Sequence, residues 1–222
     1  MNERLVMSWS GGKDGALALH ELVEGGAYHI EGLLTTLTAG EPERIQMHGQ
    51  RRELLERQAR ALGIPLITVV LPPSPSNGAY AEAMSGTLLP LRRAGLRHIG
   101  FGDVHLADLR AWREHNLISL GMKGVFPLWR RDSRALVEKA VAVGIRAVIC
   151  CVDPERLPPS FLGRELTEQL LAELPEGVDP CGENGEFHTF VHAGPGFASP
   201  VAYRLGERFE RDGFAFQDLL PG

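Results

Sequence analysis

Strand-like and helix-like segments alternate along most of this chain. Apolar, strand-like runs lie at residues 4–10, 28–38, 64–71, 97–103, 124–129 and 145–153. Helical patterns lie at residues 14–26, 49–63, 79–95, 106–121, 133–144 and 163–175. Strands that are separated by helices are typical of parallel βαβ units. The sequence therefore predicts an α/β fold with a doubly wound, Rossmann-like parallel sheet.

The turns that follow these strands are polar. They cover residues 10–15, 38–48, 71–78, 103–108 and 153–159. Open α/β sheets bind ligands beyond the carboxyl ends of their strands, so we expect the five turns to share one rim. The alternation weakens after residue 128. We therefore expect residues 1–128 to form a main domain at this rim, and residues 129–222 to form a smaller C-terminal lobe.

The turn after the first strand combines backbone freedom with a single lysine. It consists of Ser10, Gly11, Gly12, Lys13, Asp14 and Gly15. Its glycines let backbone N–H groups turn toward one point, and the next helix adds the positive end of its dipole, so the turn predicts a phosphate site. It is neither a Walker A loop, since Asp14 follows the lysine, nor the dinucleotide motif G-x-G-x-x-G. An ordinary tight strand–helix turn is the alternative.

Composition argues against several classes of protein. The formal net charge of -5 disfavours a broad nucleic-acid-binding surface. No apolar stretch approaches the roughly 20 residues that span a bilayer, and the first residues lack an apolar signal core, so we expect a cytoplasmic protein without a membrane partner. The three cysteines, Cys150, Cys151 and Cys181, have no C-x-x-C spacing, which argues against a disulfide framework or a zinc knuckle.

Three separated motifs resemble those of one protein family. The glycine-rich turn is similar to the pyrophosphate loop S-G-G-x-D-S of the ATP pyrophosphatases, with Gly15 in place of the last serine. FGDVHLADLRAWREHNLISLGMKGVFPLW at 101–129 and DPCGENGEFHTFVHAGP at 179–195 resemble blocks of the diphthine–ammonia ligase family, a branch of that superfamily. Met47-His48, LGIP at 62–65 and FLGREL at 161–166 also fit, so the resemblance covers nearly the whole chain.

This resemblance implies a fold of the HUP class (adenine nucleotide α-hydrolase-like) and a reaction. Residues 1–128 would bind ATP and Mg²⁺, and residues 129–222 would form the substrate lobe. A substrate carboxylate would attack the α-phosphate and release pyrophosphate, and ammonia would then displace AMP to give an amide. In archaea and eukaryotes the acceptor is diphthine on translation elongation factor 2. In a bacterial host the acceptor is open, and the chain could also pair as a homodimer.

The resemblance also implies a set of site residues. The ATP site would comprise Ser10 through Gly15 with His48, Gly102 and Asp103, and Asp103 would also bind Mg²⁺. Lys13 would stabilise the departing pyrophosphate, with Asp14 beside it, and His188 or Glu186 would deprotonate ammonium. Because carboxylates repel phosphates, we expect the C-terminal motif to hold acceptor or ammonia and not the triphosphate. Its expected substrate residues are Arg110, Glu183, Asn184, Glu186, His188 and Thr189.

Several of these residues have structural alternatives, and so does the function. Asp103 could simply cap the next helix, Arg110 could form a surface pair with Glu114, and His48 could be structural. The rival functions are a non-catalytic ATP- or AMP-binding sensor, which Gly15 favours, and a tRNA-modifying enzyme on the same fold. The acidic charge and the adjacent Cys150 and Cys151 count against the tRNA-modifying enzyme, because two cysteines within an apolar strand are expected to be buried and inert.

Overall fold

A computed structural model describes residues 2–40, 43–45 and 48–222 of the chain. The N-terminal half forms a five-stranded sheet in the order β3-β2-β1-β4-β5, and all of its neighbouring strands are parallel. Its strands are β1 (Glu3–Ser8), β2 (Tyr28–Thr38), β3 (Leu66–Leu71), β4 (His98–Gly100) and β5 (Lys123–Val125). Met47, which the sequence analysis singled out, lies outside the described residues.

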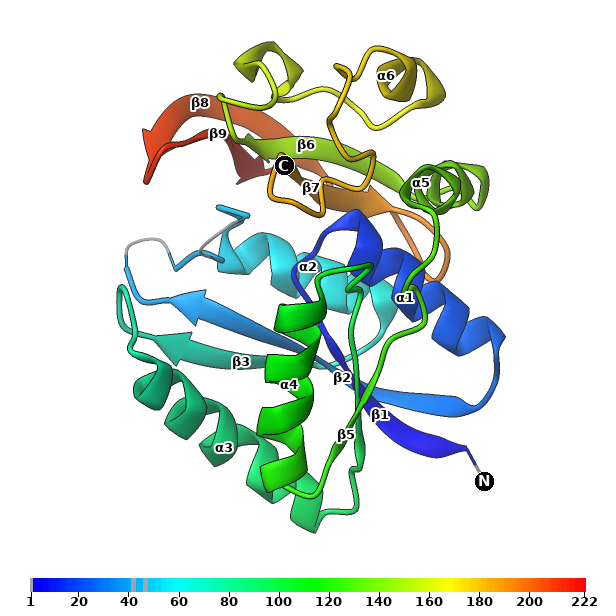
Figure 1. The fold of residues 1–222 in the computed structure, drawn as a ribbon, viewed down its shortest axis with the longest axis vertical. Coiled ribbons are helices and arrows are strands. Elements are labelled where there is room, and N and C mark those ends of the chain that lie inside the picture. The colour runs from blue at the N-terminus through cyan, green and yellow to red at the C-terminus, as the bar shows by residue number, and fades with distance from the viewer. Residues whose placement is uncertain (1, 41–42, 46–47) are drawn as a thin grey trace.

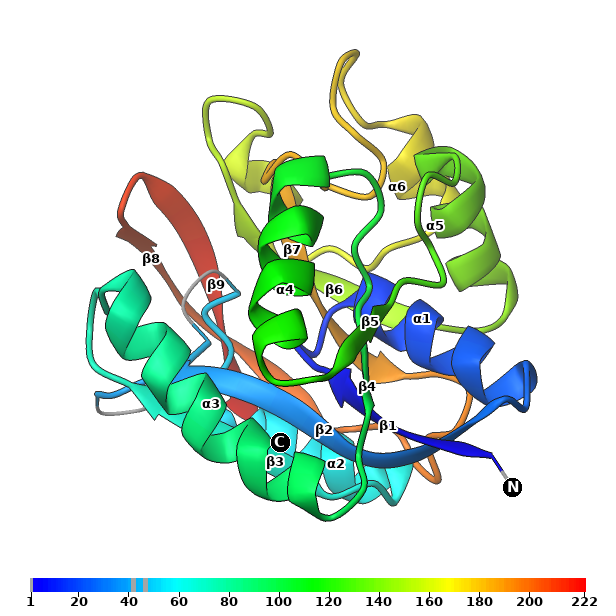
Figure 2. The same cartoon turned by 60° about the horizontal axis from the view of Figure 1, so that its bottom comes forward.

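Helices cover both faces of the parallel sheet. Figures 1 and 2 show α1 (Lys13–Glu24) and α2 (Arg52–Leu62) on one face, with α3 (Asn77–Arg93) and α4 (Ala107–Ser119) on the other. This arrangement confirms the doubly wound α/β fold that the alternating pattern predicted. None of the described helices is long and apolar enough to cross a membrane.

The C-terminal part forms a second, antiparallel sheet in the order β7-β6-β9-β8. Its strands are β6 (Arg146–Val152), β7 (Phe187–Ala193), β8 (Tyr203–Arg211) and β9 (Phe214–Pro221), and it carries α5 (Ser133–Ala142), α6 (Glu168–Ala172) and a short 3₁₀ helix, η1 (Pro159–Phe161). The expectation that the turn at 153–159 lies on the rim of the parallel sheet was wrong, because β6 pairs antiparallel with β7 and β9. An apolar run of β-branched residues does not show which sheet will bury it.

The last expected helix, at 163–175, is reduced to the five residues of α6. Residues 163–166 instead follow β6 as an extended segment. Gly163 N donates to Ile149 O at 2.9 Å, and Leu166 N donates to Ala147 O at 2.7 Å. Thr167 then caps α6, since its hydroxyl accepts from Leu170 N at 3.1 Å. Backbone hydrogen bonds to a sheet edge have here overridden a helical sequence pattern.

One continuous apolar core joins the two sheets through α1. Leu17 of α1 is 1% exposed, and it belongs to the same cluster as Leu55 of α2, Ile149 of β6 and Val191 of β7. A second cluster lies under α3 and α4 on the far face of the parallel sheet. Because α1 is packed between the sheets, its N-terminal end and the glycine-rich turn before it lie directly against β7.

Candidate functional site

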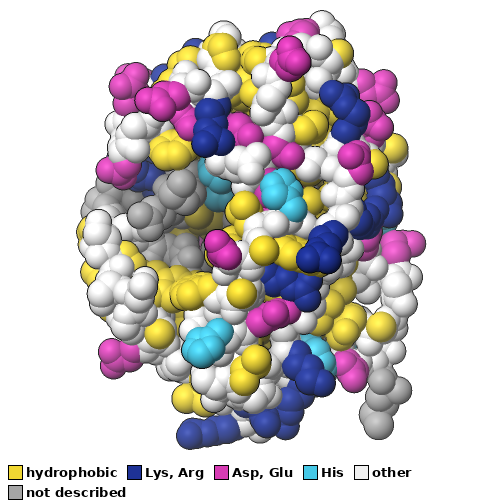
Figure 3. Space-filling model, in the orientation of Figure 1, with side chains coloured by type: hydrophobic (Ala, Val, Ile, Leu, Met, Phe, Trp, Pro, Cys, Tyr) yellow, Lys and Arg dark blue, Asp and Glu magenta, His cyan; other side chains and the backbone are white. Residues whose placement is uncertain are grey.

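A cavity of about 460 Å³ lies at the carboxyl edge of the parallel sheet, a size that is typical of small-molecule sites. Figure 3 shows this face hollowed, with histidine and apolar side chains exposed around the recess. The polar part of its wall consists of the glycine loop together with Thr35, His48, Asp103, Glu183, His188 and Thr189. The apolar part lies between the sheet and helices α3 and α4, and includes Leu34, Met84, Leu88, Ile99, Phe101 and Leu117.

The glycine loop (residues 10–15) is held in shape by the buried Gln58 of α2. Gln58 is completely buried, and its Nε2 donates to Gly11 O at 3.0 Å and to Val191 O at 2.6 Å. Its Oε1 accepts from the indole N–H of Trp9 at 2.9 Å. Gly11 has a φ of +77°, and a Cβ there would lie only 2.7 Å from Gln58 Oε1 and would also collide with Gln50. The loop therefore requires glycine at position 11.

Strand β7 runs directly beside the loop. Val191 N donates to Gly11 O at 2.8 Å, and Lys13 N donates to the hydroxyl of Thr189 at 3.1 Å. Gln50 Nε2 donates to Thr189 O at 2.7 Å. The C-terminal motif thus forms one wall of the glycine loop, although Thr189 lies 176 residues from Lys13 in the sequence.

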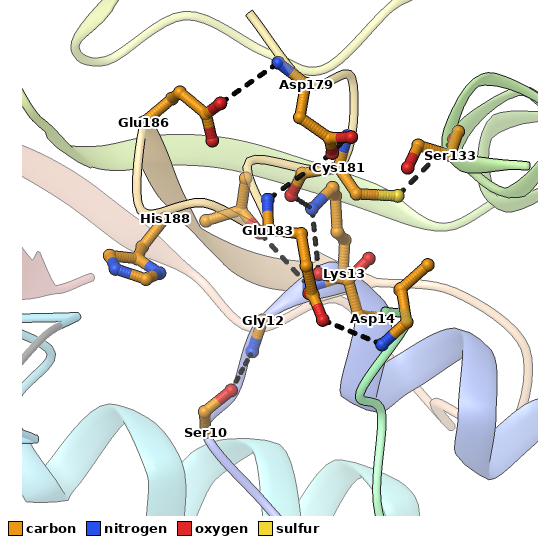
Figure 4. Close-up of polar contacts among 12 residues, drawn as sticks. Ser10, Gly12, Lys13, Asp14, Ser133, Asp179, Cys181, Glu183, Glu186 and His188 are labelled. Carbon is orange, nitrogen blue, oxygen red and sulfur yellow. Dashed lines mark hydrogen bonds and ion pairs between the residues drawn. The ribbon is translucent and has the colours of Figure 1, made fainter. Parts of the chain in front are cut away.

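The Lys13 side chain connects the loop to the C-terminal motif. It is 2% exposed, and its ammonium donates to Asp14 Oδ2 at 2.8 Å and to the carbonyl of Cys181 (Figure 4). Burial by itself would lower the pKa of Lys13, but the charges of Asp14 and its other acidic neighbours outweigh burial and raise that pKa. The ammonium also lies 5.2 Å from the centre of the Phe187 ring. Lys13 therefore remains charged at neutral pH.

Carboxylates from three segments face the same part of the cavity. Asp103 lies 2.8 Å from Arg113 Nε, and Glu183 Oε1 accepts from the backbone N–H groups of Val104 at 2.8 Å and His105 at 3.2 Å. Burial raises the pKa of both Asp103 and Glu183, and repulsion by Asp14 raises both further. A cation would relieve this repulsion.

The carboxylates do not form a complete metal site on their own. Within residues 2–40, 43–45 and 48–222, no group of three or more His, Cys, Asp or Glu side chains is arranged to hold a metal ion. Protein Mg²⁺ sites usually combine one or two carboxylates with phosphates and water. The carboxylates of Asp103 and Glu183, whose charges repel, could supply the one or two protein ligands of such a site.

Two histidine rings lie in contact, tilted relative to one another, at the cavity wall. The rings of His48 and His188 lie 4.4 Å apart at 33°. Burial, together with the charge of Lys13, lowers the pKa of His48 to about 4. Burial and the neighbouring His48 and Lys13 hold the pKa of His188 well below its usual value. His48 Nδ1 and His188 Nε2 are buried and have no hydrogen-bond partner among the described residues. Both imidazoles are therefore neutral at pH 7.

Three of the expected substrate residues lie outside the cavity wall. Glu186 is 2% exposed, and its carboxylate accepts from the backbone N–H groups of Asp179 at 3.2 Å and Asn184 at 3.0 Å, so it holds the turn together. Asn184 itself is exposed. The Arg110 guanidinium lies 4.5 Å from the Phe126 ring centre. It also lies 4.6 Å from the Trp129 ring centre and pairs with Glu114 at 2.9 Å.

Other expected residues do line the cavity, and three important ones were missed. Gly102 lines the cavity, and its backbone lies very close to that of the glycine loop. A Cβ at Gly102 would lie 2.8 Å from the backbone of Asp14 and Gly15, so only glycine fits there. Sequence reasoning missed the residues that hold the site in place, which are Gln50, Gln58 and Arg113. Gln58 carried a signal, since it interrupts the apolar face of its predicted helix.

These features define a doubly wound, Rossmann-like α/β protein with a glycine loop at the start of α1 and a cavity beside it. Two family models match the chain: the diphthamide synthase N-terminal domain matches residues 3–124, and the diphthamide synthase C-terminal domain matches residues 132–214. The chain therefore belongs to the diphthamide synthase family, which confirms the predicted relationship to the diphthine–ammonia ligases.

Curated relatives carry the corresponding name. A diphthine–ammonia ligase of Danio rerio is 27% identical over 219 residues, which cover 89% of this chain and 85% of that protein. A diphthine–ammonia ligase of Mus musculus is 32% identical over 117 residues, or 50% of this chain and 44% of the mouse protein. Among solved structures, one described as a predicted subunit of tRNA methyltransferase from Methanocaldococcus jannaschii matches 65% of this chain and 77% of its own, with 18% identity and a TM-score of 0.42.

Proposed function

We propose that this protein is an ATP-dependent, amide-forming ligase of the diphthine–ammonia ligase type. It would adenylate a carboxylate with release of pyrophosphate, and ammonia would then release AMP. The observation that carries this proposal is the composition of one cavity, in which a glycine loop, an apolar slot and a pair of neutral histidines meet.

The two parts of the cavity wall suit the two ends of ATP. The backbone N–H groups of the glycine loop other than that of Lys13, which bonds to Thr189, and the N-terminal end of α1 would hold the phosphates, because both present positive partial charge. The slot lined by Leu34, Ile99, Phe101 and Leu117 would hold the adenine, since a flat base gains most from apolar walls. His48 lies beside the glycine loop, since a Cβ at Gly12 would come within 3.2 Å of its ring.

Asp103 and Glu183 would contribute ligands to Mg²⁺ that accompanies the nucleotide. The ion would supply charge neutralisation for the leaving pyrophosphate. Lys13 supplies a second positive charge at the same end of the loop. Its ammonium is already fixed by Asp14 and the Cys181 carbonyl, so it needs no reorganisation during the reaction.

His188 is the best placed group to take a proton from ammonium. Its ring lines the cavity and is unprotonated at pH 7, because burial lowers its pKa. The same burial makes it a weak base in the empty cavity, and the negative charge of bound phosphates would raise its pKa toward the working range. Proton transfer by a positioned side chain of this kind contributes on the order of 10²–10⁴-fold to rate. We assign Arg110, Asn184 and Glu186 supporting roles in the lobe, since none of their side chains lines the cavity.

A second candidate function is a nucleotide sensor without turnover. It is favoured by Gly15, which leaves the loop without the hydroxyl that the pyrophosphate-loop motif carries at that position. A tRNA-thiolating role is disfavoured because all three cysteines are buried, and burial raises the pKa of Cys150 to about 12.

Product analysis separates these functions. The protein is incubated with ATP, Mg²⁺ and ammonia, either with elongation factor 2 that carries diphthine or with a cell extract as the source of acceptor. Over many turnovers a ligase gives AMP and pyrophosphate in equal amounts, and sustained turnover needs both acceptor and ammonia. Acceptor without ammonia should release no more than about one pyrophosphate per enzyme. Tight ATP binding without either product supports the sensor, and ADP with inorganic phosphate contradicts the pyrophosphatase mechanism.

A further inference from the structure

The phosphate end of the cavity contains a hydroxyl group that comes from the second sheet. We infer that Thr189 of β7 donates a hydrogen bond to the nucleotide phosphates and so supplies the hydroxyl that the glycine loop lacks at Gly15. The phosphate site would then be built jointly by the parallel and the antiparallel sheet. This inference rests on the proposed nucleotide site and adds a ligand-binding role for the C-terminal motif.

The hydroxyl of Thr189 has a free donor. Thr189 is 2% exposed and lines the cavity, and its Oγ1 accepts from the backbone N–H of Lys13 at 3.1 Å. A hydroxyl can accept and donate at the same time. In the part of the chain that the structure describes, the Thr189 hydroxyl takes part in hydrogen bonding as an acceptor alone. Its proton is therefore available to an acceptor that enters the cavity.

The position of this hydroxyl suits a phosphate. Lys13 is the first residue of α1, so its N–H belongs to the positive end of the helix dipole, where anions are favoured. This N–H already donates its hydrogen bond to Thr189 Oγ1, so it does not bond to an anion directly. Its positive partial charge reaches the anion by way of the Thr189 hydroxyl. An accepted hydrogen bond polarises the hydroxyl and strengthens its own donation. The Lys13 N–H and the Thr189 hydroxyl thus form a chain of two donors, in which the hydroxyl is the one that faces the cavity.

The backbone of Thr189 is held in place on both sides. Gln50 Nε2 donates to its carbonyl at 2.7 Å, and Val191 N, two residues along β7, donates to Gly11 O at 2.8 Å. A Cβ at Gly12 would come within 3.3 Å of Thr189 O, so loop and strand are in close contact. This placement preorganises the hydroxyl before a ligand binds.

Gly15 explains why a hydroxyl from elsewhere is needed. It lines the same cavity, and a Cβ at this position would meet only ring carbons of Trp9, at 3.8 and 4.0 Å. These are ordinary van der Waals distances, so the fold has room for a serine there. A serine at position 15 therefore fits, and combining it with loss of the Thr189 hydroxyl tests whether one hydroxyl can replace the other.

The experiment measures the affinities of ATP and adenosine by titration calorimetry for the full chain. The variants are Thr189→Val, Thr189→Ser, Gly15→Ser and the double variant Thr189→Val with Gly15→Ser. Thr189→Val keeps the shape but removes the hydroxyl, and we expect it to weaken ATP about tenfold or more while adenosine stays within about twofold. Thr189→Ser should retain wild-type affinity for both ligands, and the double variant should recover most of the lost ATP affinity.

Thr189→Val also leaves the N–H of Lys13 without an acceptor, so thermal melts accompany the titrations. Gly15→Ser alone provides a test of the inference that holds even if Thr189→Val does not fold. If Thr189 already supplies the donor, Gly15→Ser should change the ratio of the ATP and adenosine affinities by less than about threefold. A tenfold gain in ATP affinity from Gly15→Ser alone would overturn the inference, because the donor would then have been missing.

Two further results would overturn the inference. One is unchanged ATP affinity in a folded Thr189→Val variant, and the other is equal weakening of ATP and adenosine. If the wild-type protein binds neither ligand, the proposed nucleotide site itself is contradicted and the inference falls with it.

Discussion

The glycine loop and the C-terminal motif at 179–189 meet at one cavity, but they use their polar groups differently. The loop presents backbone N–H groups at the start of a helix, where such groups have no hydrogen-bond acceptor within the helix. The C-terminal motif uses most of its polar side chains to bind backbone N–H groups of the protein itself. Glu183 binds those of Val104 and His105, and Glu186 binds those of its own turn.

This difference shows that a dense polar motif need not be a set of substrate ligands. The motif fastens the second sheet to the glycine loop, and only part of it reaches the cavity. Lys13 belongs to both regions, because its ammonium binds Asp14 in the loop and the carbonyl of Cys181 in the motif. Variants at residues of each kind should therefore differ in the size and kind of their effects.

The largest effect is expected for Lys13→Met, which keeps the volume of the side chain and removes its charge. We expect ATP to bind at least about 30-fold more weakly and acceptor-dependent AMP release to fall by about 10³-fold, while adenosine binding changes only a few-fold. The matched control is Lys123→Met, at an exposed lysine of β5, which should behave like wild type. Titrations with both ligands check this, and equal weakening of ATP and adenosine would contradict a phosphate role for Lys13.

His188→Gln should separate chemistry from binding. Glutamine keeps polar character but cannot take up a proton, so we expect AMP release to fall on the order of 100-fold while ATP affinity stays within a few-fold. His105→Gln is the control, because His105 is an exposed histidine on the turn that Glu183 binds. Turnover that persists in His188→Gln would show that the proton acceptor is another group.

The buried histidine pair should also make stability depend on pH. The pKa of His48 is about 4 in the folded protein, below the ordinary value near 6.5 that applies when the chain is unfolded. As pH falls below about 6.5, the unfolded state binds the proton first, so stability is lost progressively down to about pH 4.

Urea unfolding of wild type, His48→Gln and His29→Gln between pH 7.5 and 4.5 measures this dependence. His29 is an exposed control. The slope of the free energy of unfolding against pH should be smaller in His48→Gln and unchanged in His29→Gln. Equal slopes in all three proteins would mean that His48 is not held neutral by the fold.

The smallest catalytic effect is expected for Glu186→Gln. Its carboxylate holds the turn and does not line the cavity, so we expect the melting temperature to fall by a few degrees, ATP affinity to stay within about twofold, and AMP release to fall less than tenfold. Asn184→Ala removes the Nδ2 donor to the same carboxylate, at 3.1 Å, and should show a weaker form of the same change. A 100-fold loss of turnover in a stable Glu186→Gln would place Glu186 among the reacting groups.

The glycine loop and the parallel sheet could be predicted because their signals are local. The string from Ser10 to Gly15 lies between an apolar strand and an amphipathic helix, and the structure retains both. The antiparallel sheet was not predicted, because the apolar run of β6 is compatible with either kind of sheet. Strands β8 and β9 alternate only weakly in burial, and no expectation covered them.

The parts of the site that depend on long-range contacts could not be predicted. That Glu186 points into its own turn, or that Thr189 meets the N–H of Lys13, follows from how β7 packs against α1. The buried glutamines at 50 and 58 are polar side chains that only the folded neighbourhood explains, since each bonds to the backbone of β7. Sequence reasoning could name the motif but could not divide it into ligand-facing and structural residues.

The most direct test of the account is a crystal structure with Mg²⁺ and α,β-methylene-ATP, in which the bond that would release pyrophosphate cannot be cleaved. We predict that the adenine lies in the slot near Leu34 and Phe101, with the β- and γ-phosphates against residues 11–15. A phosphate oxygen should lie within hydrogen-bond distance of the Thr189 hydroxyl. A nucleotide bound away from the glycine loop, or phosphates that contact the loop but leave Thr189 unpaired, would contradict the claim that both sheets build one phosphate site.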